Sequence, residues 1–71
     1  MTNMKRYVIH FKHGVTEGEV WNAISGCRAL RRSRDDMPHN VLVKVDVPDN
    51  NADALEGRLD ADDTVQNWVK A

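Results

Sequence analysis

The stretch VLVKVDV, residues 41–47, alternates with a period of two. Four valines occupy every second position, and Leu42, Lys44 and Asp46 occupy the positions between them. Successive side chains of a strand point to opposite faces, and valine favours strands. The valine face is therefore predicted to be buried and the other face to contact water, which is typical of an antiparallel sheet covered on one side.

Three further segments have strand character. Residues 5–12, KRYVIHFK, place Tyr7, Ile9 and Phe11 on one face. Residues 27–34, CRALRRSR, predict a second strand with Cys27, Ala29 and Leu30 directed inward. Pro38 and its polar neighbours, residues 35–40, predict a turn after it. Residues 64–70 predict a closing strand.

Two segments are predicted to be helical. Thr16 is a good N-cap, Glu19 three residues later completes a capping box, and Gly26 is suited to the helix end. The second helix lies within residues 48–61, where Asp49, Asn50 or Asn51 is the candidate cap. Its apolar side chains recur at three- and four-residue steps.

The elements follow the order β-α-β-β-α-β over a single domain, residues 1–71. This order predicts an α+β ferredoxin-like sandwich, with a four-stranded antiparallel sheet and both helices on one face. At this length nearly every apolar side chain is needed for the core, so Trp21 and Trp68 are expected to be core or half-buried residues rather than anchors for a partner.

The composition of the chain disfavours several classes of function. The chain has 10 basic and 11 acidic residues, a formal charge of −1, so no global attraction to nucleic acid or membrane follows. Cys27 is the only cysteine and is expected to be a buried small hydrophobe. His10 and His13 fall on opposite faces, so neither metal nor cofactor is expected. The sequence predicts a non-enzymatic cytoplasmic protein without a signal peptide or membrane span.

Three quoted segments resemble the subtilisin propeptide-like inhibitor family, the prosegments and free-standing inhibitors of subtilisin-type serine proteases. RYVIHFKHGVTEGEV is similar to the opening strand, turn and helix start of these domains. ISGCRALRRSR is similar to their helix exit and second strand, and NADALEGRLDADDTVQNWV to their second helix, acidic turn and closing strand.

The resemblance implies a protein partner, a subtilisin-type protease whose active-site cleft the domain occludes. In the family, the outer sheet face packs on two protease helices and the tail enters the cleft. The segment nearest the cleft would be Trp68, Val69, Lys70 and Ala71. Family tails continue for several residues past the closing strand, whereas two residues follow Val69 here.

Two alternatives remain open. In the first, the domain is a small host-modulating or phage-type factor that regulates another intracellular protein. It would bind through an edge or through the sheet face expected to carry Arg28, Arg32, Leu42 and Lys44. The arginines of residues 28–34 could also contact nucleic acid if they share one face.

Overall fold

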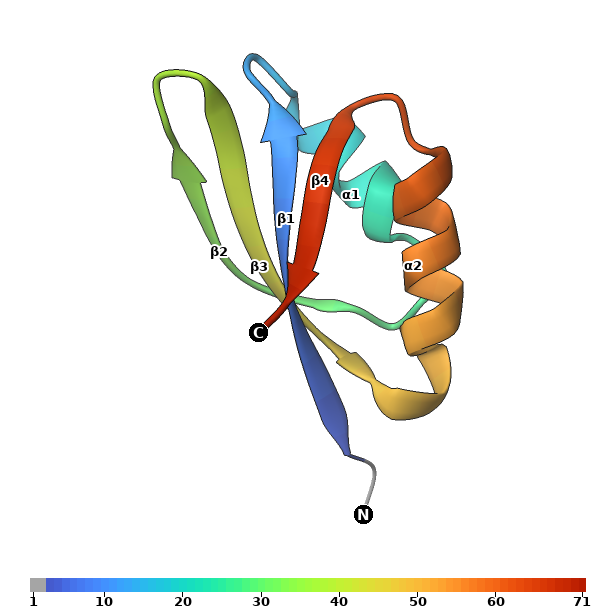
Figure 1. Cartoon of the computed structure of the whole chain (residues 1–71). Helices are drawn as coiled ribbons and strands as arrows, with labels where there is room; N and C mark the ends of the chain where they lie inside the picture. Colours follow the sequence, from blue (N-terminus) through green and yellow to red (C-terminus); the bar gives the residue numbers. More distant parts are fainter. Residues whose placement is uncertain (1–2) are drawn as a thin grey trace.

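The computed structural model describes residues 3–71, which form a four-stranded antiparallel sheet with two α-helices packed on one face (Figure 1). The element order is β1 (Met4–Lys12), α1 (Glu17–Ile24), β2 (Leu30–Asp36), β3 (Asn40–Pro48), α2 (Ala52–Ala61) and β4 (Val65–Lys70). A short 3-10 turn, η1 (Asp49–Asn51), leads into α2. The strand order across the sheet is β2-β3-β1-β4. This is the ferredoxin-like arrangement, and the fold prediction is confirmed.

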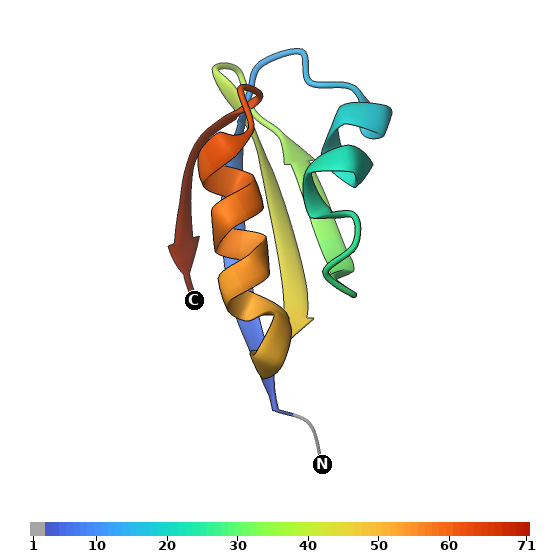
Figure 2. The same ribbon diagram turned by 90° about the vertical axis from the view of Figure 1, so that its right-hand side faces the viewer.

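The core lies between the sheet and the helices (Figure 2). The alternation in β1 and β3 decides which side chains enter it, as predicted. The two strands contribute Tyr7, Ile9, Phe11, Val41, Val43, Val45 and Val47, all almost completely buried. Burying an aliphatic or aromatic side chain of this size contributes about 1.5–3 kcal/mol, and this pair of strands supplies seven of the 15 buried apolar side chains of residues 3–71.

The first helix begins as the sequence predicts. The Thr16 hydroxyl accepts a hydrogen bond from the Glu19 amide, and the Glu19 carboxylate accepts one from the Thr16 amide. The helix buries Val20, Ala23 and Ile24. Trp21 is 50% exposed and does not belong to the core cluster, which leaves the half-buried alternative of the prediction.

The second helix buries Ala52, Leu55 and Leu59, as its spacing predicts. Asn51 is the N-cap residue but makes no side-chain capping bond, because η1 continues directly into the helix.

The start of the second strand differs from the prediction. β2 begins at Leu30 rather than Cys27 and continues to Asp36. Cys27 is buried, but in the loop after α1, and Arg28 has a left-handed φ of 54° that a strand cannot contain. Leu30 is 53% exposed and pairs with Asp46, so it points away from the helices and not inward.

The closing strand β4 pairs with β1 and contains a register shift opposite the step from His10 to Phe11. Val65 lies opposite Phe11 and Trp68 lies opposite Ile9, so both face the helices although they are three residues apart. A regular strand would place them on opposite faces; the bulge accommodates one extra residue and restores the common side. Both pack on the core at its margin.

Candidate functional site

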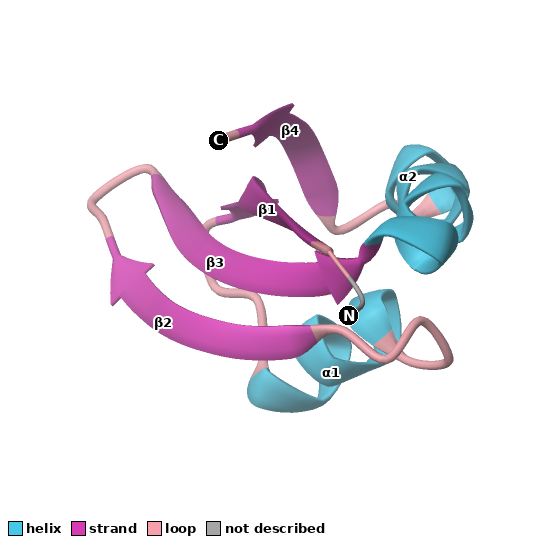
Figure 3. Ribbon diagram, turned by 90° about the horizontal axis from the view of Figure 1, so that it is seen from below, coloured by secondary structure: helices cyan, strands magenta, loops and turns pink. Residues whose placement is uncertain are grey.

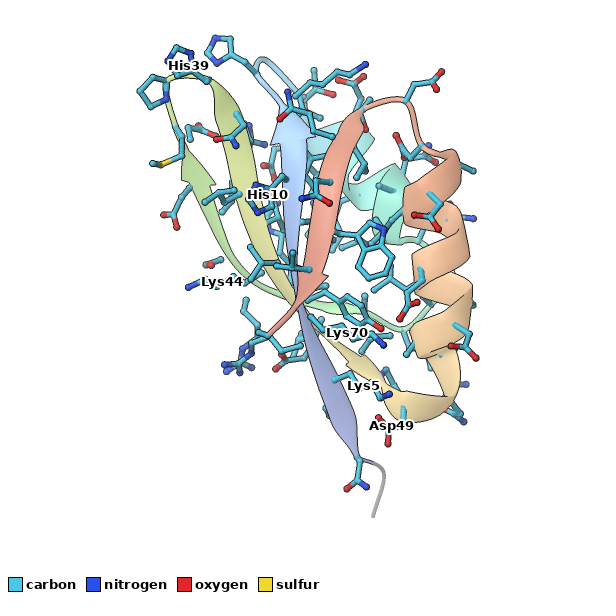
Figure 4. All side chains as sticks on the ribbon, viewed as in Figure 1. Lys5, His10, His39, Lys44, Asp49 and Lys70 are labelled. Atoms are coloured by element: carbon cyan, nitrogen blue, oxygen red, sulfur yellow. The ribbon has the colours of Figure 1, made fainter. Side chains whose placement is uncertain are left out.

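The face of the sheet opposite the helices is the main surface that the fold leaves uncovered by α1 and α2 (Figure 3). We call it the open face. Its side chains alternate with the buried ones and come from all four strands: Arg6, Val8, His10 and Lys12 of β1, Leu42, Lys44 and Asp46 of β3, Leu30, Arg32 and Asp35 of β2, and Asn67 and Val69 of β4. In Figure 4, His10 and Lys44 lie on this side of the sheet.

The open face has an apolar component. Val8 is half-buried and lies directly opposite Val69, which is 45% exposed, and Leu42 is half-buried on the neighbouring strand β3. Leu30 adds a second exposed aliphatic side chain at the β2 edge. Aliphatic side chains surrounded by polar ones are typical of protein-protein interfaces, whose centres are drier than their rims.

The charges of the open face are unequal. Of the 10 basic and 11 acidic side chains of the protein, four basic and two acidic ones lie on this face. Arg6 donates to Asp46 at 2.9 Å, and Arg32 lies 3.6 Å from the same carboxylate. The hydrogen bond from Arg6 holds the pKa of Asp46 below its ordinary value. Within residues 3–71, Lys12 and Lys44 form no ion pair, so the face presents net positive charge.

The closing segment, residues 68–71, was predicted to lie nearest a protease cleft. Its side chains in β4 point to both sides of the sheet. Val69 belongs to the open face. Trp68 faces the helices, where its ring meets Tyr7 edge-on at 5.6 Å and its Nε1 donates to Asp60 at 2.8 Å. Lys70 also faces that side, with its Nζ 3.3 Å from the Glu56 carboxylate.

Ala71 continues the pairing of β4, because its amide donates to the Arg6 carbonyl at 2.9 Å. The chain therefore leaves the sheet beside β1, below β4 in Figure 1.

Three of the four residues expected on one sheet face do share it. Leu42, Lys44 and Arg32 lie on the open face, whereas Arg28 lies in the loop before β2. The opposite-face position of Val8 follows from the alternation of residues 5–12 alone. Strict alternation from Cys27 and Ala29 also places Leu30 on the opposite face, so the prediction that Leu30 points inward departed from the strand pattern.

The arginines of residues 28–34 do not form one basic face. Arg31 and Arg34 both reach Glu17 of α1, on the helix side of the sheet. Arg31 also stacks on Trp21, with its guanidinium carbon 5.1 Å from the ring centroid. Of the three arginines in β2, only Arg32 contributes to the open face. A nucleic-acid contact through a shared arginine surface therefore has no geometric support, and that alternative stays a sequence-based hypothesis.

An open hollow lies where β4 ends beside β1. Its lining consists of Met4, Lys5, Arg6, Asp46, Lys70 and Ala71. The ion pair of Arg6 with Asp46 and that of Lys70 with Glu56 already engage three of these side chains. The lining contains no Ser, Thr, Cys or His side chain. Among residues 3–71, no group of three or more His, Cys, Asp and Glu side chains is arranged to hold a metal ion.

A scan against protein-family models and a search of curated proteins returned no match to this chain. No α-helix in residues 3–71 has the length and hydropathy needed to cross a membrane.

Proposed function

We propose that this protein is a non-enzymatic binding domain that docks on another protein through the open face. The observation that carries the proposal is the combination on one uncovered surface of Val8, Leu42, Leu30 and Val69 with four cations. Apolar side chains supply burial, and the surrounding cations select a partner whose contact surface is acidic.

The specific partner that we propose is a subtilisin-type serine protease. The support is the resemblance of the three sequence segments to propeptide-like inhibitors, together with the ferredoxin-like fold that those segments adopt. In this mode the open face packs on the protease surface, and β4 directs residues 69–71 toward the active-site cleft. The domain occludes the cleft without any chemistry of its own.

Inhibition kinetics test this proposal. The protein is incubated with a subtilisin-type protease while hydrolysis of a chromogenic peptide is followed. We expect inhibition that weakens more than about tenfold in Leu42→Asp, since truncation of an interface anchor costs more than about 1.4 kcal/mol. Ala54→Asp, which introduces the same carboxylate on the exposed surface of α2, is the matched control and should inhibit like the parent protein. Absence of inhibition at high micromolar protein contradicts the protease assignment.

The closing segment needs a substitution rather than a deletion. Removing residues 68–71 would also remove the packing of Trp68 on Tyr7. Val69→Asp changes the open face of the same segment and leaves that aromatic pair intact. Loss of inhibition in Val69→Asp, with an unchanged circular dichroism spectrum, supports contact of the closing strand with the protease.

The same surface serves the second candidate, a regulator of another intracellular protein. Capture from lysate separates the two, because a non-protease partner that binds the parent protein and not Leu42→Asp identifies the open face as the docking surface of a different complex.

A further inference from the structure

The sheet has two edge strands, β2 and β4. They differ in how readily their outward N–H and C=O groups can pair with a further strand. In an antiparallel ladder, residues that bond to the partner strand alternate with residues whose N–H and C=O groups point the other way. The Ala71 amide donates to Arg6 and the Lys12 amide donates to the Thr64 carbonyl. With the register of β1 and β4, these bonds place Val69 and Asn67 toward β1. The backbone groups of Trp68 and Lys70 therefore point outward from the edge.

The β2 edge carries the features that natural proteins use to prevent strand addition. The sequence LRRSRDD is mostly charged, and its register shifts between Arg31 and Ser33. A bulge and a row of charges disfavour pairing with another strand. The β4 edge has the sequence VQNWVK, in which Lys70 is the only charged residue. Its own register shift lies between Val65 and Asn67, so Trp68 and Lys70 remain in a regularly paired stretch. The β4 edge is thus the one suited to accept a further strand.

The surroundings of β4 select the chemistry of that strand. On the helix side, Asp53, Glu56 and Asp60 lie along α2 at three- and four-residue steps and so form one acidic stripe. Asp60 is hydrogen-bonded to Trp68, and Glu56 lies beside Lys70, so the stripe borders the edge. In Figure 4, the Lys70 side chain lies beside the end of β4, on the side of α2. On the open face, the same edge presents Val69.

We propose that the β4 edge binds an extended, basic segment of a partner protein by strand addition. Its backbone pairs with the outward groups of Trp68 and Lys70. A Lys or Arg side chain opposite Trp68 lies on the helix side, within reach of the Asp60 carboxylate and against the indole ring. The next side chain along the segment falls opposite Val69, where an apolar residue extends the open face. This site shares only Val69 with the open face, and it does not depend on the proposed inhibitor function.

Nuclear magnetic resonance titration with capped peptides tests the site. The probe is a peptide of about six residues, the usual strand length, in which Arg and Val alternate. Its matched partner has Glu in place of Arg. We expect the Arg peptide to shift the amide signals of Trp68 and Lys70 and the indole signal of Trp68, and to slow exchange of the two amides. The indole of Trp21, on α1, serves as an internal control.

Two variants separate backbone pairing from charge. Lys70→Pro removes an outward amide at a position where proline suits an edge strand, and Lys70→Gln removes the same cation while keeping the amide. We expect Lys70→Pro to abolish binding and Lys70→Gln to retain it. Asp60→Asn keeps an acceptor for Trp68 and should weaken the Arg peptide about threefold, as an exposed ion pair does.

Three results overturn the proposal. One is equal binding of the Arg and Glu peptides. Another is undiminished binding of an Arg peptide that is N-methylated at the amides facing β4, a test that holds even if Lys70→Pro does not fold. The third is protection of the Trp68 and Lys70 amides that rises with protein concentration without peptide, since a second copy of the chain would then occupy the edge.

Discussion

At the scale of single residues, Tyr7 connects the sheet to the second helix. Its ring is buried against Trp68, and its hydroxyl donates to Glu56 of α2, a carboxylate that Lys70 also approaches. Burial and the adjacent Glu56 carboxylate raise the pKa of Tyr7 well above its ordinary value, so the hydroxyl keeps its proton and remains a donor. One side chain thereby links β1, β4 and α2.

Replacing Tyr7 with Phe should destabilise the domain by about 1 kcal/mol, because the ring packing is kept and one hydrogen bond is lost. Urea unfolding followed by tryptophan fluorescence measures the change. Glu56→Gln is the informative companion, since it keeps an acceptor for the hydroxyl and should cost less than Tyr7→Phe. A Tyr7→Phe variant as stable as the parent would show that the hydrogen bond does not contribute.

In the loop before β2, substitutions at two nearby positions are expected to change stability in opposite directions. Gly26 has a φ of 78° and Arg28 a φ of 54°. A residue with a side chain pays about 1 kcal/mol or more in this region, whereas glycine enters it freely. Gly26→Ala should therefore lower the unfolding midpoint, and Arg28→Gly should leave it unchanged or raise it. Because Arg28 lies outside the sheet, Arg28→Gly should also bind its partner normally; a loss of binding would place this loop in the interface.

At the scale of elements, residues 41–47 show how far the sequence alone leads. Their alternation identifies the strand, its buried face and the antiparallel class of sheet, and the Thr16 box fixes the start of α1. In both cases the information is local. The start of β2, by contrast, is not determined by a local pattern. Cys27 and Ala29 have a strand-like spacing, but Cys27 is buried in a loop and Arg28 turns the chain.

The candidate surface was predictable to a similar extent. Alternation places Leu42 and Lys44 on the uncovered face, and the structure adds Val8 opposite Val69. The direction of Trp68 could not be read from the sequence, because a bulge between Val65 and Trp68 changes which residues share a side. Bulges depend on pairing between strands far apart in the chain, which local patterns do not encode.

The capping box predicts a measurable difference between the two helices. Thr16→Ala removes the hydroxyl that accepts from Glu19 and should cost about 1 kcal/mol. Asn51→Ala, at the N-cap of α2, removes no side-chain capping bond and should change stability by only a few tenths of a kcal/mol. Thermal unfolding of the two variants side by side checks the contrast. Equal losses would mean that the box contributes no more than an uncapped helix start.

At the scale of the whole molecule, basic and acidic side chains are distributed unequally over the surface, although the formal charge is only −1. The open face has four basic and two acidic side chains, which leaves six basic and nine acidic ones elsewhere. The acidic stripe of α2 and the positive open face lie on different sides of β4. The net charge alone favours no polyanionic partner. The open face and the acidic stripe, taken separately, each favour a partner surface of opposite charge.

Three carboxylates join the elements and make the stability of the fold depend on pH. Hydrogen bonds lower the pKa of Glu17 through Arg31 and Arg34, that of Asp46 through Arg6, and that of Glu56 through Tyr7 and then Lys70. These contacts connect α1 to β2, β1 to β3, and α2 to β1 and β4, respectively.

A carboxylate with a lowered pKa binds protons less readily in the folded than in the unfolded chain, so its stabilisation is complete above the unfolded values. These ordinary values are 4.5 for Glu and 3.8 for Asp. As the pH falls through the lower pKa values of the folded state, the contribution is lost. We therefore expect the urea midpoint to be constant between about pH 6 and 7 and to decrease toward about pH 3. Glu17→Gln, which cannot titrate, should show a smaller decrease over the same range. An equal decrease in Glu17→Gln and in the parent protein would show that the pairs of Glu17 with Arg31 and Arg34 do not contribute to the pH dependence.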